Sequence, residues 1–551
     1  MFKCKQLLRR ICVVSYVFLL CGGLVNASNL VSKTNTLIGT QGNGWASGYL
    51  YPGATYPFGM VQFTPTYFTK QLGFVINQLS GAGCDHMGNF PTLPIAGALR
   101  VSPDSILNMQ TPVGKEIGTA GYYAATVDHS IRAELTVTER TGMARYTFSS
   151  KEKQGTVIIG GGVAATSIQV AAIKITGPHS CEGYAEGGAF CGIPTPYKVY
   201  FVAEFDADAE SFGTWKEERL HANHTFAEGS HSGVYFTFPL KEGNQAVQYK
   251  IGVSYVSVEN ARENLRVENP AWDFSAVRQA TQDKWNEYLG KIEVEGDNED
   301  RQMQFYTHLY RSLIHPNVCS DVNGEYMGAD SQVHKTARKF YTSFSNWDTY
   351  RTQTALIAML APEETSDIVM SHYLFAEQSG GGFPRWVLAN IETGVMQGDP
   401  TPILVANAYA FGARNYDPRT LLRTMRYGAE VPGANSQGVL TRPGLEQYLE
   451  KGYYDASILL EYTSSDFAIG RFALQACNDE PVCNWYTQRA MNWKNLFNKE
   501  TGWLQSRNED GSWKRYDADW RESTYKNYFW MVPYDLQGLI DRKGSGGEAF
   551  G

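Results

Sequence analysis

Short runs of β-branched and aromatic residues alternate with polar positions through the first half of the chain. Clear examples are residues 131–137, 155–159, 197–203 and 247–253. Gly, Asn, Asp and Ser separate these runs, and short alternating strands divided by such turns are typical of an antiparallel sandwich. The pattern therefore predicts an N-terminal antiparallel β-sandwich domain over residues 28–270.

From residue 271 onward, apolar positions recur every three or four residues, which is the spacing of amphipathic helices. The predicted helices span residues 273–289, 300–315, 348–360, 363–378, 403–412, 418–428, 445–451, 464–476 and 482–497. Long polar loops connect them, and no series of strands lies between them. This arrangement predicts an α/α toroid over residues 271–551 whose loops line a cleft.

The first 27 residues have the pattern of an export signal. Four basic residues precede an apolar run over residues 11–20, and Val25 and Ala27 stand at the spacing that a signal peptidase reads. The run is too short to anchor the chain, and no later stretch is apolar enough to cross a membrane. We expect cleavage after Ala27 and a secreted or periplasmic protein without an integral membrane segment. Cys21 leaves lipidation open as an alternative.

Cysteine usage agrees with export. Six cysteines follow the predicted signal: Cys84, Cys181, Cys191, Cys319, Cys477 and Cys483. An oxidising compartment permits small-loop disulfides between Cys181 and Cys191 and between Cys477 and Cys483, while Cys84 and Cys319 have no obvious partner. None of the six stands in a zinc-ligand pattern.

Composition narrows the function further. The 551 residues carry a formal net charge of −8 with no basic clusters, which argues against nucleic acid as a partner. The chain contains 12 Trp, 33 Tyr and 27 Phe residues, and such an aromatic content suits either carbohydrate contact or a large core. Dinucleotide-binding and phosphate-binding loop motifs are absent from the sequence.

Three nearby segments combine aromatic and charged side chains in the way a sugar site requires. Residues 343–353 contain Trp347 and Asp348, residues 380–386 contain Arg385 and Trp386, and residues 394–400 contain Asp399. An indole stacks on the C–H face of a sugar ring, while carboxylates and guanidinium groups bind its hydroxyls. These five residues are the predicted substrate-binding set.

Each of these residues also has a structural interpretation. Core packing is the alternative for Trp347, and Arg351 stands at the i,i+3 spacing that allows an ion pair with Asp348. Arg385 and Trp386 are able to form a cation–π pair within their Gly-rich loop. Asp399 precedes a proline and is a candidate N-cap for the helix that follows.

Longer motifs carry a resemblance to a known family. They are Tyr-Pro-Gly-Ala-Thr-Tyr-Pro-Phe-Gly-Met-Val-Gln at residues 51–62, Leu-Ser-Gly-Ala-Gly-Cys at 79–84, Phe-Tyr-Thr-His-Leu-Tyr-Arg at 305–311 and Trp-Arg-Glu at 520–522. With the Trp-Asp segment, they resemble glycoside hydrolase family 92, the exo-acting α-mannosidases. The resemblance implies a β-sandwich packed on an (α/α)6 barrel, a site between them, a calcium ion, and hydrolysis with inversion.

The resemblance also assigns a catalytic residue. The family pattern Glu-x-x-x-x-x-Tyr-x-Trp is matched by Glu522, Tyr528 and Trp530, which carries the role of general acid onto Glu522. We expect its aromatic neighbours to shield the carboxyl from water. The structural alternative is a surface glutamate paired with Arg521.

Family members continue beyond the position that matches Gly551. The resemblance places the general base and some calcium ligands on that continuation, so the barrel is expected to be incomplete here and the metal ligands stay unassigned. We expect either an exported exo-acting α-mannosidase, acting on terminal α-linked mannose of a glycan or glycoprotein, or a degenerate hydrolase that only binds mannose. The resemblance also implies that the loop at residues 80–89, with Asp85 and His86, reaches from the sandwich toward the site; the alternative is a Gly-rich turn with a solvated aspartate.

Overall fold

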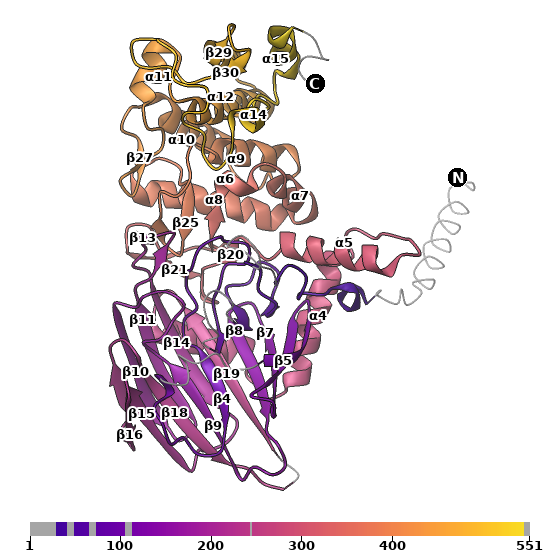
Figure 1. Cartoon of the computed structure of the whole chain (residues 1–551), viewed down its shortest axis with the longest axis vertical. Coiled ribbons are helices and arrows are strands. Elements are labelled where there is room, and N and C mark those ends of the chain that lie inside the picture. The colour runs from indigo at the N-terminus through magenta and orange to yellow at the C-terminus, as the bar shows by residue number, and fades with distance from the viewer. Residues whose placement is uncertain (1–28, 41–48, 66–72, 105–112, 243–244, 545–551) are drawn as a thin grey trace, which may run out of the picture.

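The computed structural model describes residues 29–40, 49–65, 73–104, 113–242 and 245–544. The predicted signal peptide, its cleavage site and Cys21 lie outside these residues. Figure 1 shows two stacked parts, with the purple strands of the first half below and the orange and yellow helices of the second half above. The predicted order, antiparallel sheets followed by a helical region, is confirmed.

Two antiparallel sheets form the N-terminal part, and their facing side chains share one core. In spatial order, the eight-stranded sheet contains β1 (Ala54–Thr55), β2 (Gln62–Pro65), β3 (Phe74–Val75), β4 (Thr92–Ala96), β9 (Gln154–Gly160), β18 (Ser232–Pro239), β15 (Ser211–Lys216) and β16 (Arg219–Ala222). The nine-stranded sheet contains β17 (Phe226–Glu228), β10 (Val170–Gly177), β11 (Ser180–Glu186), β14 (Lys198–Phe205), β19 (Ala246–Ser254), β8 (Thr141–Thr147), β7 (Ile131–Val137), β6 (Tyr122–Val127) and β5 (Val113–Thr119).

The strands follow the sequence pattern that predicted them. In β11, Cys181, Gly183 and Ala185 are buried while the residues between them are partly exposed, which is the period of two of a strand with one buried face. The run predicted at residues 131–137 coincides with β7. β9 is buried along nearly its whole length because strands cover both of its edges and the core covers one face.

The helices begin immediately after the last strand of the sandwich. They are α3 (Val258–Glu268), α4 (Phe274–Leu289), α5 (Glu299–Ser312), α6 (Asn346–Thr349), α7 (Gln353–Leu360), α8 (Pro362–Ser379), α9 (Thr401–Ala410), α10 (Pro418–Glu430), α11 (Leu445–Lys451), α12 (Ala456–Cys477), α13 (Glu480–Ala490), α14 (Tyr525–Tyr528) and α15 (Leu536–Lys543), with 3₁₀ turns η1 (Leu30–Lys33) and η2 (Met491–Leu496). Helix α3 was not predicted from the sequence. The predicted domain boundary near residue 270 falls between α3 and α4.

Short two- and three-stranded pieces lie outside the two large sheets, one within the sandwich sequence and the others in the loops of the helical part. They are β12 (Ala189–Phe190) with β13 (Ile193–Pro194), β20 (Asn317–Val318) with β23 (Tyr341–Thr342), β21 (Glu325–Met327) with β22 (Val333–Lys335), β24 (Phe344–Ser345) with β25 (Trp386–Leu388) and β26 (Ile391–Glu392), β27 (Asn435–Ser436) with β28 (Val439–Leu440), and β29 (Phe497–Asn498) with β30 (Trp503–Leu504). The β12–β13 hairpin belongs to the sandwich in sequence and reaches up to the helical part (Figure 1).

Helix α12 is the centre of the helical part. It packs against α9, α10 and α13, and most of its 22 residues are buried. A helix that is buried on all sides has no solvent-facing polar side, so apolar and polar residues do not alternate with the helical period that marks a helix start in a sequence. This explains why the helix predicted at residues 464–476 begins at Ala456 instead. Among the described residues, no helix combines the length and the apolar character needed to cross a membrane.

The disulfide pattern differs from the sequence-based expectation. Cys84 is bonded to Cys191, whereas Cys181, Cys477 and Cys483 are free thiols, so both predicted small-loop pairs are wrong. The reason is orientation: Cys181 points into the sandwich core from β11, while Cys191 lies in the turn between β12 and β13. The bond ties the loop at residues 80–89 to that hairpin.

Removing this disulfide is expected to destabilise the fold, because the bond closes a loop with a sequence separation of 107 residues. Loop-closure entropy predicts a loss on the order of 4 kcal/mol for Cys84→Ala/Cys191→Ala. Thermal unfolding measured with and without reductant checks this. The double variant should unfold several degrees lower and ignore the reductant, whereas a Cys181→Ala control should remain reductant-sensitive. Equal midpoints for wild type and double variant would contradict the pairing.

Candidate functional site

The Trp347–Asp348 pair lies on the short helix α6, which the neighbouring loop holds in place. Ser345 pairs with Trp386 between β24 and β25. The buried Asn346 side chain donates to the Pro384 carbonyl at 3.1 Å and to the Thr401 hydroxyl at 2.9 Å. The segment that follows α6 turns before α7 begins at Gln353, so the single helix predicted over residues 348–360 is divided into two.

The Glu461 carboxylate on α12 contacts the donor groups of three side chains in residues 347–351. Trp347 Nε1 donates to Glu461 Oε1 at 3.0 Å, Tyr350 Oη donates to Oε2 at 3.1 Å, and Arg351 Nη2 lies 3.4 Å from Oε1. The carboxylate is completely buried. Burial raises the pKa of Glu461 to about 7, although Arg351 and the hydrogen bonds favour the charged form.

Glu522 and Trp347 line one cavity of about 440 Å³. The other lining residues are Arg351, Arg521, Ser523, Asn527, Tyr528, Trp530 and Met531. Glu522 has a φ of 50°, a left-handed conformation that is uncommon for residues other than glycine. Of the predicted catalytic and substrate-binding residues, Trp347 and Glu522 are among the described residues that line this cavity, whereas Asp348, Arg385, Trp386 and Asp399 are not.

The expected shielding of Glu522 by aromatic rings is not observed. The Glu522 side chain is exposed. Trp520 packs on Tyr528 with ring centroids 5.3 Å apart, and Phe529 packs on Trp503 at the same separation, so these rings cover one another instead of the carboxyl.

Asp348 and Arg351 adopt different roles at the site. Asp348 is exposed and accepts a hydrogen bond from the Ser345 hydroxyl. Arg351 pairs with Glu461 in place of the i,i+3 partner Asp348, and its guanidinium lies 5.0 Å from the centroid of the Trp347 ring. Trp347 is therefore bounded by a cation on one side and a carboxylate at its edge.

Arg385 and Trp386 are buried next to this site. Arg385 Nε donates to the Gly398 carbonyl at 2.9 Å and Nη2 donates to the Leu440 carbonyl at 3.1 Å. The Trp386 ring packs on Phe190 of the β12–β13 hairpin, with centroids 4.1 Å apart. The Arg side chain thus braces two loops, and the Trp ring joins the sandwich to the helical part.

Asp399 belongs to a buried ionic network. Its carboxylate accepts from Arg442 Nε at 2.8 Å, Arg442 Nη1 donates to Asp466 at 2.7 Å, and Arg489 Nε donates to Asp466 at 2.7 Å. Although burial raises it, the two arginines hold the pKa of Asp466 below its ordinary value. Asp399 does not cap α9, whose N-cap is Pro400 without a side-chain bond.

The loop at residues 80–89 has structural partners. His86 is buried, and its Nε2 accepts from the Leu79 N–H at 2.6 Å, whereas Asp85 is exposed. Burial lowers the pKa of His86 to about 4. Neither residue is among the described side chains that line the cavity with Glu522.

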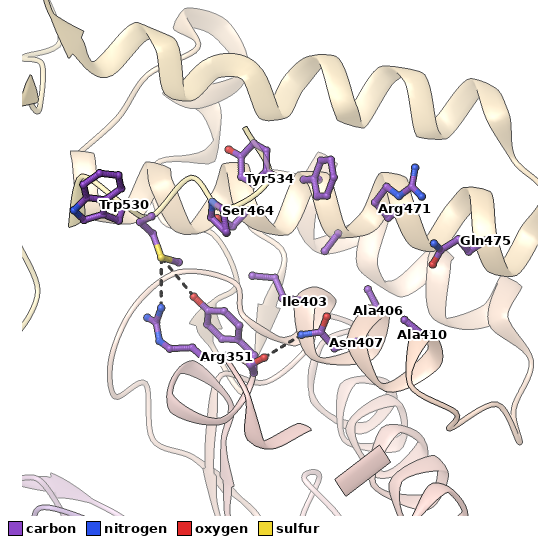
Figure 2. A pocket seen from close by; sticks show the side chains of 15 residues that line it. Arg351, Ile403, Ala406, Asn407, Ala410, Ser464, Arg471, Gln475, Trp530 and Tyr534 are labelled. Carbon is purple, nitrogen blue, oxygen red and sulfur yellow. Dashed lines mark hydrogen bonds between the residues drawn. The ribbon is translucent and has the colours of Figure 1, made fainter. Parts of the chain in front are cut away.

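A second cavity of about 580 Å³ lies between α9 and α12 (Figure 2). Arg351, Trp530 and Met531 line both cavities. Met531 Sδ accepts from Arg351 Nη1 at 3.4 Å, and Asn407 donates to the Tyr350 carbonyl at 3.0 Å (Figure 2). The turn at residues 350–351 therefore forms a wall between the two cavities.

The described residues do not by themselves form a calcium site. Within the described ranges, no group of three or more His, Cys, Asp or Glu side chains is placed to hold a metal ion. Glu522 is the only carboxylate among the described residues that line its cavity. Calcium prefers six to eight oxygen ligands, so the donor set seen here does not fit the ion, and no step is assigned to it.

Sequence reasoning missed Glu461. A signal was present, because this glutamate follows the apolar run Ile458-Leu459-Leu460. A charged residue next to such a run is costly to bury and therefore points to a paired or functional carboxylate. Its three partners lie more than 100 residues earlier, so the sequence offered no means to name them.

Two antiparallel sheets followed by a helical part, with a cavity lined by aromatic side chains, two arginines and one glutamate, is an arrangement compatible with a glycoside hydrolase. Residues 34–254 match the glycosyl hydrolase family 92 N-terminal domain, and residues 260–550 match the glycosyl hydrolase family 92 catalytic domain. The chain belongs to glycoside hydrolase family 92. The predicted family resemblance and fold class are thus confirmed.

Individual relatives, two of them with solved structures, support the same assignment. The chain is 25% identical to a family GH92 α-mannosidase of Bacteroides thetaiotaomicron, with a TM-score of 0.86 over 95% of this chain and 73% of that one. It is also 25% identical to a GH92 inverting mannosidase of Bacteroides thetaiotaomicron VPI-5482, with a TM-score of 0.85 over 94% and 73%. An uncharacterized secreted glycosidase of Arthroderma benhamiae is 24% identical over 94% of this chain and 72% of its own length.

Asp399 provides a test of the buried network. Asp399→Asn removes the charge that Arg442 faces, and breaking a buried ion pair costs about 3 kcal/mol. Urea unfolding at pH 7 should show this loss. The exposed Asp417, which caps α10, is a matched control, because Asn replaces Asp well at an N-cap. If Asp399→Asn is as stable as the wild type, the ion pair between Asp399 and Arg442 does not contribute to the stability of the fold.

Proposed function

We propose that this protein is an exported exo-acting α-mannosidase that hydrolyses terminal α-linked mannose from glycans or glycoproteins with inversion. One observation carries the proposal: in a family 92 chain, Trp347 and Glu522 line the same cavity. An aromatic face and an acid beside each other are what a glycosidase needs to hold a sugar and protonate its leaving group. The similarity to relatives described as α-mannosidases supports mannose as the sugar.

Glu522 is the proposed general acid. In its protonated form it donates a proton to the glycosidic oxygen as the bond to the anomeric carbon breaks. Its left-handed backbone conformation is of the kind that accumulates at functional sites, where surrounding structure supports the strain. Trp347 supports the C–H face of the mannose ring, and the exposed Asp348 carboxylate accepts from its hydroxyls.

Arg385, Trp386 and Asp399, predicted from the sequence to bind substrate, have a supporting role in this proposal, because none of them is among the described residues that line the cavity. All three are buried, so they act by holding the loops that flank Trp347. Arg385 supports this through the carbonyls that it binds, and Trp386 supports it through its pairing with Ser345.

The general base of the proposed mechanism is not among the described residues that line the cavity. An inverting enzyme needs a second carboxylate about 6.5–9.5 Å from the acid to activate water. Because Glu522 is the only carboxylate among the described lining residues, the same observation favours one alternative, a mannose-binding protein without turnover. Hydrolysis of a mannoside separates the two proposals.

Export to the periplasm or the extracellular space is part of the proposal. It rests on the signal-like residues 1–27, which lie outside the described residues, and on the cysteine bond between Cys84 and Cys191. A relative described as a secreted glycosidase is consistent with it.

Replacing Glu522 by Gln in the complete natural reading frame keeps the side chain's shape and removes its proton. We expect kcat to fall about 10²–10⁴-fold on a mannoside with a poor leaving group, because general acids contribute on that order. An aryl mannoside with a good leaving group needs less protonation and should lose less. Glu509→Gln, a change at an exposed glutamate, is the control. An equal loss on both substrates would instead give Glu522 a binding role.

Calcium dependence is the second test of the proposal. The family resemblance predicts that chelation abolishes hydrolysis in the complete natural reading frame and that Ca²⁺, but not Zn²⁺, restores it. Residues 28–551 alone should bind Ca²⁺ weakly in a calorimetric titration, because the described residues lack a suitable ligand cluster. Tight stoichiometric binding by residues 28–551 would mean that the ligands lie within this chain.

A further inference from the structure

Glu461 lies behind the sugar cavity and is not one of the described residues that line it. We propose that Glu461 is a positioning residue, which fixes the edge of the Trp347 indole so that the ring presents one face to the mannose. The inference deepens the proposed function and rests on it, because it takes Trp347 as the plate under the sugar. Glu461 itself touches no substrate.

The geometry of the carboxylate carries the proposal. An indole has a single polar hydrogen, on Nε1, and that hydrogen is committed to Glu461 Oε1 at 3.0 Å. Tyr350 Oη occupies Oε2, and Arg351 approaches Oε1 as well. One carboxylate therefore holds three side chains of a five-residue turn. Without it, the half-buried Trp347 ring loses the only hydrogen bond that sets its rotation.

The carboxylate is held rigidly from the other side. Glu461 projects from α12, the most buried helix of the domain. Gly398, with a φ of 75°, lies directly against it, and a Cβ at that position would come within 2.5 Å of Glu461 Cβ. Side chains that orient a binding residue work best when their own position is fixed by packing on a regular element.

The ionised Glu461 carboxylate destabilises the folded state because it is buried. Such a cost is typical of a side chain that is kept for its function. The charged and titratable groups that face Glu461 are Arg351 and Tyr350 from the turn after α6 and Tyr528 from α14. Burial raises the pKa of Tyr528, and the charges of Glu461 and Glu522 raise it further. Arg351 is the single cation in this set, and it does not offset the burial of the carboxylate, because the pKa of Glu461 stays raised at about 7.

This pKa gives the proposal a definite pH dependence. Above pH 7 the ionised carboxylate accepts from all three donors, and below it the protonated form loses acceptor capacity, so Trp347 is held less firmly. The free energy of unfolding depends on pH in the opposite direction. A carboxyl whose pKa rises on folding from 4.5 to about 7 stabilises the folded state as pH falls through that interval. A glutamine lacks this effect, so its advantage over Glu is largest above pH 7.

The test compares wild type with Glu461→Gln in the full chain at pH 8. Calorimetry with methyl α-D-mannoside should show a Kd about tenfold higher in the variant, as expected for one lost hydrogen bond to a charged group. Its thermal midpoint should be equal or higher. Glu430→Gln is the matched control, because Glu430 also accepts from a tyrosine and an arginine (Tyr486 Oη at 2.8 Å and Arg426 Nε at 2.7 Å) away from the cavity. Its Kd should match wild type.

A readout without sugar separates this inference from the proposed function. In protein labelled with 5-fluorotryptophan, the ¹⁹F resonance of Trp347, assigned with Trp347→Phe, should shift or broaden in Glu461→Gln. It should also change in the wild type as pH falls through about 7. Altered resonance without mannoside binding to the wild type would reject the proposed function and keep the positioning role.

Three outcomes would overturn the positioning role. One is an unchanged Trp347 resonance together with a wild-type Kd in Glu461→Gln. Another is an equal effect of Glu461→Gln in the Trp347→Phe background, since residues that act through each other are not additive. If the variant does not fold, the wild-type pH titration decides alone: a resonance that stays constant from pH 5.5 to 8.5 overturns it.

Discussion

The need to satisfy two carboxylates inside α12 organises the helical part of this protein. Asp466 and Glu461 are both completely buried on one helix. Removing a carboxylate from water costs several kcal/mol unless well-placed partners compensate for it. Arg442, Arg489 and Tyr448 surround Asp466, and Trp347, Tyr350 and Arg351 surround Glu461. The loops that carry these partners are therefore held where α12 requires them.

This constraint connects the scaffold to the site. Arg442 binds Asp399 as well as Asp466, so the loop at residues 394–400 is anchored to α12 through one guanidinium. Glu461 anchors the turn that carries Trp347. Two of the three segments predicted to form one sugar site are thus tied to α12, and of their predicted site residues Trp347 lines the cavity while Asp399 is buried in the ionic network. Hydrogen bonding decides which of these side chains is buried and which one lines the cavity.

The sandwich contributes to the same region by a separate route. The bond between Cys84 and Cys191 holds the β12–β13 hairpin, and Phe190 of that hairpin packs on Trp386. Trp386 in turn pairs with Ser345, two residues before Trp347. A disulfide in the first part of the chain thereby supports a ring stack that positions the cavity of the second part.

The sequence by itself determined the order of the two parts, most of the strands and helices, and the family, because local periodicity and long contiguous motifs are properties of neighbouring residues. It also pointed to Trp347 and Glu522. Only the tertiary structure decided that Cys84 bonds to Cys191, that Asp399 faces Arg442, and that Glu461 holds Trp347. Those contacts join segments 40 to more than 100 residues apart, and they depend on which face of each element is turned inward, which no local pattern records.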